Sequence, residues 1–122
     1  MSFKDLGVNA ALTKVLHTSG IEKPFPIQKA TLPDAIAGKD ILGRGQTGSG
    51  KTLAFGLALM TRLAGRTAAS MRPLALVLSP TRELAMQISD VIAPLSRSVN
   101  LNSQVVAGGL SYSKQIQALK RG

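Results

Sequence analysis

Short apolar runs alternate with segments of helical periodicity along this chain. The clearest run is Leu74–Leu78, which is bounded by Pro73 and Pro80. A continuous apolar run of this length is typical of a strand covered on both faces in a parallel sheet. Two further stretches, Asp40–Arg44 and Gln104–Ala107, are also predicted to be strands.

A predicted helix follows each predicted strand. Thr52–Leu63 is mostly apolar and long enough for a buried helix. The next helix begins near Thr81, and Pro94 should end or kink it, because proline lacks the N–H and clashes with the preceding turn. Its apolar face is formed by Leu84, Ile88, Val91, Ile92 and Leu95. Ser111 is suited to cap a last helix that runs to Lys120.

The first 38 residues are predicted to form a helical N-terminal segment. Apolar residues recur at helical spacing in Val8–Ser19, and Gly20 stands at the position that stops such a helix. Ile27–Ala37 is also helical in pattern, but Pro33 should break or restart it. Residues 39–122 then carry the alternating strands and helices.

Alternation of strands and helices predicts an α/β fold, a parallel sheet flanked by helices with right-handed crossovers. A chain of 122 residues is at most one ordinary domain. Because only three strands are predicted, it stays open whether the sheet is complete. An exposed edge would then make the chain marginally stable, swapped or aggregated.

The composition favours an anionic partner. Fifteen Lys and Arg residues against six Asp and Glu give a formal net charge of +9, which attracts nucleic acid, nucleotides or anionic surfaces. A solubilising surface explains the charge equally well. Few aromatic residues are present, so a base-stacking platform is not expected. No apolar run approaches the ~20 residues that span a bilayer. No cysteine is present, and a cytoplasmic protein is expected.

The stretch Gly45-Gln46-Thr47-Gly48-Ser49-Gly50-Lys51-Thr52 reads G-x-x-x-x-G-K-[ST], the pattern of a phosphate-binding loop. Its glycines permit backbone angles that a Cβ forbids, so the loop can aim its N–H groups at a phosphate. Lys51 would reach the outer phosphates, and the Thr52 hydroxyl would bind Mg²⁺. A predicted strand precedes the loop and a predicted helix follows it, as the motif requires.

Several stretches together resemble the family of DEAD-box ATP-dependent RNA helicases. Gly20–Gln28 is similar to that family's Q motif, and Phe3 stands 17 positions before Gly20, like its isolated upstream aromatic. Gln46–Thr52 resembles motif I. Pro80-Thr81-Arg82-Glu83-Leu84-Ala85 resembles motif Ia, and Gly108-Gly109 resembles the GG element. The resemblance implies a partial RecA-like domain of the P-loop NTPase class.

The resemblance implies an ATP site. Gln28 would recognise adenine, because a side-chain amide offers a donor and an acceptor that can pair with N6 and N7 together. Phe3 would stack on the base, and Lys23 and Phe25 would flank it. The residues that would hold ATP and Mg²⁺ are Gln46, Thr47, Gly48, Ser49, Gly50, Lys51 and Thr52, with Lys51 and Thr52 acting on the transferred phosphoryl group. Alternatively, Gln28 is an ordinary residue at a helix start and Phe3 a hydrophobic anchor.

The resemblance also implies contacts to the sugar-phosphate backbone of RNA. They would come from Pro80, Thr81, Arg82, Gly108 and Gly109. A helix start offers free N–H groups, a hydroxyl and a guanidinium, all suited to phosphate. Such contacts do not read sequence, and binding through them is sensitive to salt. An ordinary charged helix start is the alternative for Arg82.

The sequence departs from the family in two ways. Gly45 stands where the family usually has Ala, which should preserve binding but loosen the loop. More importantly, nothing reads Asp-Glu-Ala-Asp or Ser-Ala-Thr, and a second RecA-like domain is missing. We therefore expect residues 39–122 to be an incomplete first RecA-like domain, able to bind ATP or ADP but unable to hydrolyse ATP or unwind RNA.

Two other functions fit parts of the sequence. Another P-loop ATPase or kinase would share the phosphate loop, and a preference for GTP would favour it. A non-catalytic module that binds RNA or a protein partner through its basic face would bind RNA without nucleotide.

Overall fold

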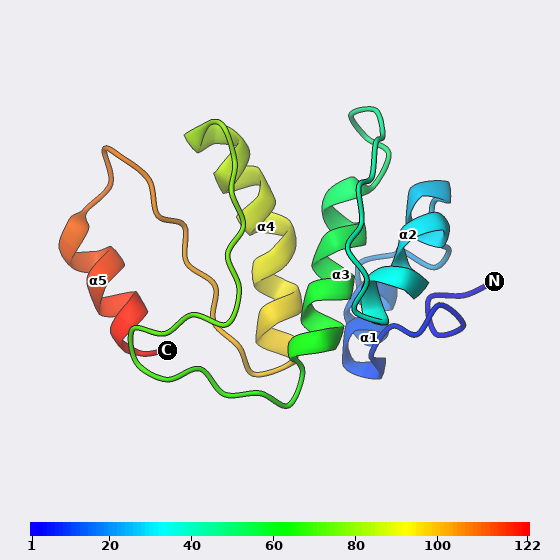
Figure 1. Cartoon of the computed structure of the whole chain (residues 1–122), viewed down its shortest axis with the longest axis horizontal. Coiled ribbons are helices and arrows are strands. Elements are labelled where there is room, and N and C mark those ends of the chain that lie inside the picture. Colours follow the sequence, from blue (N-terminus) through cyan, green and yellow to red (C-terminus); the bar gives the residue numbers. More distant parts are fainter.

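The computed structural model describes all residues, 1–122, and contains five helices (Figure 1). Their bounds are α1 Ala10–Thr18, α2 Pro26–Ile36, α3 Lys51–Leu63, α4 Arg82–Ser98 and α5 Tyr112–Lys120. Every predicted helix is present, with ends that differ from the prediction by at most two residues, except that α4 continues past Pro94 to Ser98. None of these helices is long and apolar enough to cross a membrane.

Side-chain caps explain where three of the helices begin. The Asn9 side chain accepts a hydrogen bond from the Ala11 N–H at 2.8 Å, ahead of α1. Thr81 and Ser111 accept in the same way from N–H groups of the first turns of α4 and α5. Each cap satisfies a donor that has no partner inside the helix.

The prediction that Pro33 breaks its helix or that Pro94 ends its helix is wrong. α2 continues through Pro33, and α4 continues through Pro94 to Ser98. A proline inside a helix removes one backbone hydrogen bond. Here the neighbouring residues are anchored by packing, because Leu32 is fully buried and Leu95 nearly so. Burial of these side chains offsets the missing bond and holds the helix on both sides of the proline.

The hydrophobic core joins the N-terminal segment, residues 1–38, to helices α3 and α4. Its residues are Phe3, Leu6, Val8, Leu12, Leu16, Leu32, Leu57, Ala58, Met60, Leu63, Ile92, Leu95 and Leu101. Helices α1 and α2 pack on α3, and α3 packs on α4. Only 19 of 122 residues are buried, so the core is small for a chain of this length. Helix α5 contributes only Gln115 to the buried residues.

The expected parallel sheet does not form within this chain. The prediction of strands at Asp40–Arg44, Leu74–Leu78 and Gln104–Ala107 is wrong for this chain: residues 39–46, 75–79 and 101–107 run as extended segments without strand pairing, and the one β-bridge joins Ala69 to Arg72 in the loop after α3 (Figure 1). No backbone–backbone hydrogen bond involves residues 40–45, 73–80 or 102–110. In Figure 1 the three extended segments nevertheless run in the same direction, and each leads into the next helix at the same edge of the molecule.

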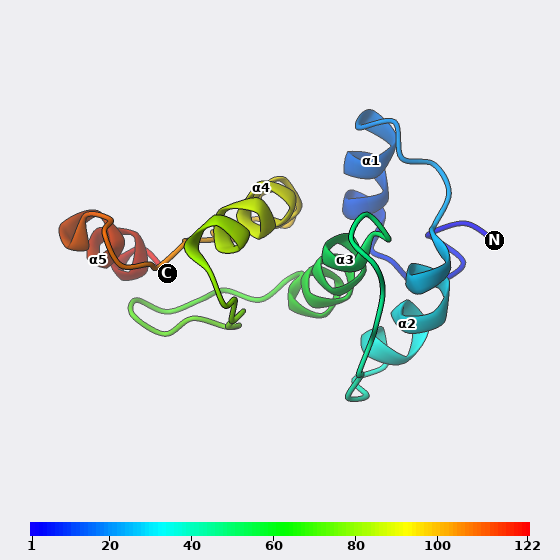
Figure 2. The same cartoon turned by 90° about the horizontal axis from the view of Figure 1, so that it is seen from above.

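A loop joins α3 to α4. Residues 66–68 form neither helix nor strand, and Gly65 and Arg66 are exposed. Figure 2 shows this segment running from α3 beneath α4 toward α5. There the Met71 N–H donates to the Leu119 carbonyl at 3.0 Å, which ties the loop to the last helix.

Candidate nucleotide and nucleic-acid sites

The phosphate loop lies between an extended segment and the start of α3. Gly48 and Gly50 have φ angles of +83° and +85°, a region that residues with a Cβ rarely adopt. Gly50 precedes α3, and no side chain caps this helix. The first N–H groups of α3 are therefore free to meet an anion, and the helix dipole favours negative charge there.

A cavity of about 490 Å³ opens beside this loop. It is lined by Gly43, Arg44, Gly45, Gln46 and Lys51, so both of its charged groups are cationic. The Ser49 hydroxyl is buried beside it and has no hydrogen-bond partner, the only such buried side-chain atom in the chain. Buried polar atoms are nearly always paired. A phosphate oxygen in this loop would supply the missing partner. Arg44 was not singled out from the sequence, although it directly precedes the motif.

Gln28 connects the Q-motif segment to the phosphate loop. Its side chain is 1% exposed. The carbonyl oxygen accepts from the Phe25 N–H at 2.8 Å, and the amide nitrogen donates to the Gly50 carbonyl at 3.2 Å. The amide keeps one further N–H and one lone pair. Adenine recognition by Gln28 stays a prediction, and it requires Phe25 or the loop to give access to the buried amide.

Gly50 is needed for this close approach. A Cβ at position 50 would lie 2.5 Å from Gln28 Nε2 and 2.8 Å from Phe25 Cδ2. A side chain at position 50 would therefore require the Gln28 amide and the Phe25 ring to move. Phe25 and Lys23 are both exposed.

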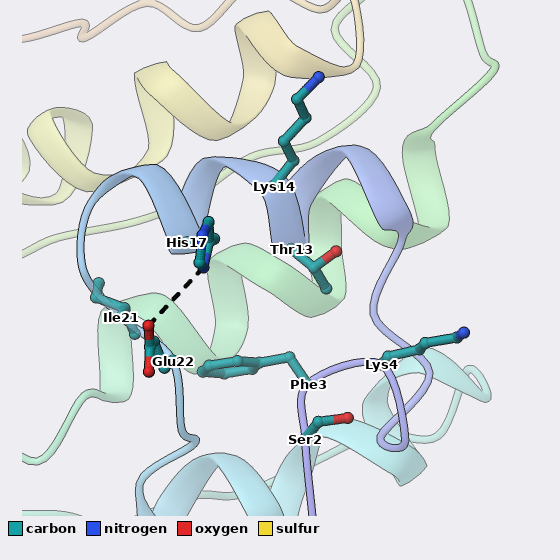
Figure 3. Close-up of a pocket in the computed structure, with 8 residues that line it drawn as sticks. All are labelled: Ser2, Phe3, Lys4, Thr13, Lys14, His17, Ile21 and Glu22. Carbon is teal, nitrogen blue, oxygen red and sulfur yellow. Dashed lines mark ion pairs between the residues drawn. The ribbon is translucent and has the colours of Figure 1, made fainter.

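Phe3 lies in the hydrophobic core and is 4% exposed. It does not line the phosphate-loop cavity. Instead it lines a second cavity between the N-terminus and α1, shown in Figure 3, together with Ser2, Lys4, Thr13, Lys14, His17, Ile21 and Glu22. This position agrees with a hydrophobic anchor, and stacking of Phe3 on adenine stays a prediction. His17 is exposed on α1, with Nδ1 3.9 Å from Glu22 Oε1.

Motif Ia and the GG element meet at the start of α4. The Arg82 Nη1 donates to the Gly108 carbonyl at 3.3 Å, although the residues are 26 positions apart. Gly109 has a φ of +81°, and a Cβ there would lie 2.7 Å from Arg82 Nη1. The Thr81 hydroxyl is occupied as the cap of α4, accepting from the Leu84 N–H at 3.1 Å. The structure thus brings together Pro80, Thr81, Arg82, Gly108 and Gly109.

Gln115 supports the same turn. It is 6% exposed, and its amide nitrogen donates to the Ala107 carbonyl at 3.4 Å. The sequence analysis assigned Gln115 no role. It is the one buried residue of α5, and its hydrogen bond to Ala107 anchors this helix to the end of the third extended segment.

The pKa of one carboxyl group, that of Asp5, is shifted, and this group lies outside both candidate sites. The backbone N–H and the hydroxyl of Ser2 donate to Asp5 at 2.8 Å each, and these bonds lower the pKa of Asp5 below its ordinary value of 3.8. Hydrogen bonds to a carboxylate favour its charged form. No group of three or more His, Cys, Asp or Glu side chains in the chain is placed to hold a metal ion.

Three features point to one family of proteins: the phosphate loop, the Gln28–Gly50 contact and the Arg82–Gly108 contact. The sequence model of the DEAD/DEAH box helicase family matches residues 25–122. The chain belongs to this family.

Individual relatives agree with this assignment. The chain is 42% identical to the ATP-dependent RNA helicase DeaD of Escherichia coli strain K12 over 122 residues, which is 99% of this chain and 19% of that protein. The crystal structure of the RNA helicase Prp28 from Chaetomium thermophilum bound to ADP is 34% identical, with a TM-score of 0.86, over 94% of this chain and 28% of that one. A DEAD-box protein from the hyperthermophile Methanococcus jannaschii is 32% identical, with a TM-score of 0.81, over 98% of this chain and 32% of that one.

These structures confirm the predicted fold class, a partial RecA-like domain. The chain spans about a fifth to a third of the length of the relatives it matches. Its helices are arranged as in those proteins. The extended segments between the helices have no strand beside them.

Proposed function

We propose that this chain binds ATP or ADP at the phosphate loop, and that a complete protein containing it couples hydrolysis of Mg–ATP to RNA binding and local duplex opening. The observation that carries the proposal is the buried, unpaired Ser49 hydroxyl inside a loop whose charged lining is cationic. Prp28, which has the same arrangement of helices, is bound to ADP in its crystal structure.

Each residue of the loop has a role in this proposal. Lys51 places its charge near the outer phosphates, and the free N–H groups at the start of α3 bind the phosphate oxygens. The Thr52 hydroxyl is the protein ligand for Mg²⁺, which would otherwise be held by phosphate oxygens and water. Magnesium bound there would neutralise charge on the phosphates.

Gln28 provides selectivity for adenine. Its free N–H and lone pair complement N7 and the N6 amino group, whereas guanine presents an acceptor in place of that amino group. Lys23 and Phe25, which are exposed, would border the base. Because Gln28 also holds the Gly50 carbonyl, occupation of the base site and the shape of the phosphate loop are linked.

In this proposal RNA binds at the motif Ia–GG contact. Arg82, the N–H groups at the start of α4 and the turn Gly108-Gly109 face one region and suit a sugar-phosphate backbone. The 122 residues contain no carboxylate positioned to activate water at the phosphate loop. We therefore expect nucleotide binding without ATP hydrolysis by this chain alone.

Thermal unfolding followed by circular dichroism tests the nucleotide site. Mg–ADP should raise the midpoint, since a ligand at a hundredfold excess over its Kd stabilises the folded state by ~2.7 kcal/mol. Mg–GDP at the same concentration should raise it less, and the Lys51→Ala variant should abolish the ADP effect. An unfolding transition that neither nucleotide changes would overturn the proposal.

A further inference from the structure

One aromatic ring stands beside the candidate RNA-contact site. Tyr112 is the first residue of α5, and it follows Gly109 by three positions. In Figure 1 the orange segment that carries the Gly108-Gly109 turn leads directly into α5. Three residues of chain span at most about 10 Å, so Tyr112 stays next to the turn that would hold a phosphate.

The Tyr112 side chain projects into solvent. It is 83% exposed, whereas Phe3 is 4%, Phe55 39% and Phe25 51% exposed. An aromatic ring gains stabilisation when it is covered by an apolar partner or another ring, and this ring has none within the chain. Exposure alone is ordinary for a tyrosine. What distinguishes Tyr112 is its place between two groups of free backbone donors.

The start of α5 suits a phosphate as the start of α4 does. The Ser111 hydroxyl accepts from the Lys114 N–H at 3.4 Å, while the N–H groups of Tyr112 and Ser113 make no backbone hydrogen bond. Lys114 adds an exposed positive charge in the same turn. A sugar-phosphate chain that crosses the Gly108-Gly109 turn from α4 to α5 would therefore meet free donors at both ends.

Hydrogen bonds on both sides of Tyr112 hold its surroundings in place. The Arg82 Nη1 donates to the Gly108 carbonyl at 3.3 Å, and the buried Gln115 amide donates to the Ala107 carbonyl at 3.4 Å. The first bond fixes the turn against α4, and the second fixes α5 against the segment before the turn. A tyrosine has only two side-chain torsions, so ordering its ring against a ligand costs little conformational entropy.

We propose that Tyr112 stacks on an unpaired base of the RNA whose backbone is held at the motif Ia–GG contact, the contact formed by Arg82 and Gly108. This inference rests on the RNA binding proposed above. The chain has too few aromatic residues for a stacking platform, but one ring beside a backbone site can hold one base. Every base has a π-face, so the contact favours single-stranded RNA over a duplex, whose bases are already stacked, and selects no sequence.

The composition of the chain supplies the probe for this contact. Tyr112 is the one tyrosine and no tryptophan is present, so tyrosine fluorescence reports on this ring alone. Oligouridylate, which does not match an adenine-selective site, should quench this fluorescence in step with its binding, measured by anisotropy of a labelled strand. Inorganic polyphosphate offers phosphates without bases and should bind without quenching. Duplex RNA should also bind without quenching.

Three variants separate the ring from charge and from general apolar surface. Tyr112→Ala should weaken oligouridylate binding by about fivefold or more, and it should leave the slope of log K against log salt concentration unchanged, because no charge is removed. Tyr112→Phe keeps the ring and should bind within about twofold of the unaltered chain. Ile116 is 42% exposed one turn further along α5. Ile116→Ala removes apolar surface without a ring and should also stay within about twofold.

Three outcomes would overturn the proposal. One is binding of oligouridylate without quenching, and another is an equal loss of affinity in Tyr112→Ala and Ile116→Ala. The third is quenching by polyphosphate to the same extent as by oligouridylate, which would show that the ring responds to phosphate and not to a base.

Failure of the stacking contact is distinguishable from failure of the RNA site. If oligouridylate does not bind the unaltered chain, both are wrong. If Arg82→Gln weakens binding and Tyr112→Ala does not, the RNA site stands and only the stacking contact is wrong.

Discussion

The candidate nucleotide site and the candidate RNA-contact site differ in what supports them. Each follows an unpaired segment and lies at the start of a helix. The phosphate loop is also tied to α2, whose residue Leu32 belongs to the core, because Gln28 donates to the Gly50 carbonyl. The RNA-contact site joins the ends of two unpaired segments, and one hydrogen bond from Arg82 connects its halves. Helices satisfy their own backbone groups, whereas extended segments need neighbours, so the phosphate loop is positioned more firmly within this chain than the RNA-contact site.

A substitution in the core and one in an extended segment should differ most in their effect on the free energy of unfolding. Leu57 is fully buried and Leu76 is 79% exposed. Leu57→Ala should lower the free energy of unfolding by about 2–5 kcal/mol, because it removes buried contacts and leaves a cavity. Leu76→Ala should change it by less than about 0.5 kcal/mol. Urea denaturation of the isolated chain measures both, and equal effects would mean that the extended segments are already packed in solution.

Two glycines of the phosphate loop provide a matched test of the Gln28 contact. Gly48 and Gly50 have nearly the same positive φ, so alanine strains the backbone similarly at both, by about 1–2 kcal/mol. Only at position 50 does a Cβ collide with Gln28 and Phe25, since nothing lies within 4 Å at position 48. Gly50→Ala should therefore lower the unfolding midpoint more than Gly48→Ala. If the two variants unfold alike, the Gln28–Gly50 contact does not hold the loop in solution.

Arg82 should contribute measurably to RNA affinity. Arg82→Gln should weaken binding of single-stranded RNA severalfold, and it should reduce the slope of log K against log salt concentration by about one, the loss of one phosphate contact. Arg97→Gln, in the last turn of the same helix, removes the same charge far from Gly108. Fluorescence anisotropy of labelled RNA over a salt series distinguishes them. Identical losses would indicate binding by net charge alone.

Substitution of Gly45 should have the smallest effect. It should change only the affinity for nucleotide. A Cβ there would lie 2.5 Å from Ser49 Oγ and 3.2 Å from Lys51 Cγ, with no backbone strain. Gly45→Ala should therefore disfavour this compact, ligand-free loop and raise ADP affinity by about threefold. Gly43→Ala meets nothing closer than 3.7 Å and should leave the affinity unchanged. Titration calorimetry measures the ADP affinity of both variants. Weaker binding of ADP by Gly45→Ala would contradict the prediction.

Local patterns predicted all five helices, and the residues that form both candidate sites remain predictions. Apolar spacing or a run of apolar residues located four helices, and Ser111 was predicted to cap the last one, as its hydrogen bond to the Lys114 N–H confirms. These features depend on residues within one or two turns of each other. The prolines at 33 and 94 were misjudged because the force that keeps those helices continuous is burial of Leu32 and Leu95 against distant residues.

The sequence by itself determined the phosphate loop, the helix order and the family resemblance, because each depends on residues that are close in the chain. Only the tertiary structure decided that Gln28 binds Gly50, that Arg82 reaches Gly108 and that Phe3 is buried in the core. It also decided that three segments with strand-like patterns remain unpaired. Apolar pattern sets the preference for an extended backbone, but a strand exists only where another strand lies beside it to share hydrogen bonds.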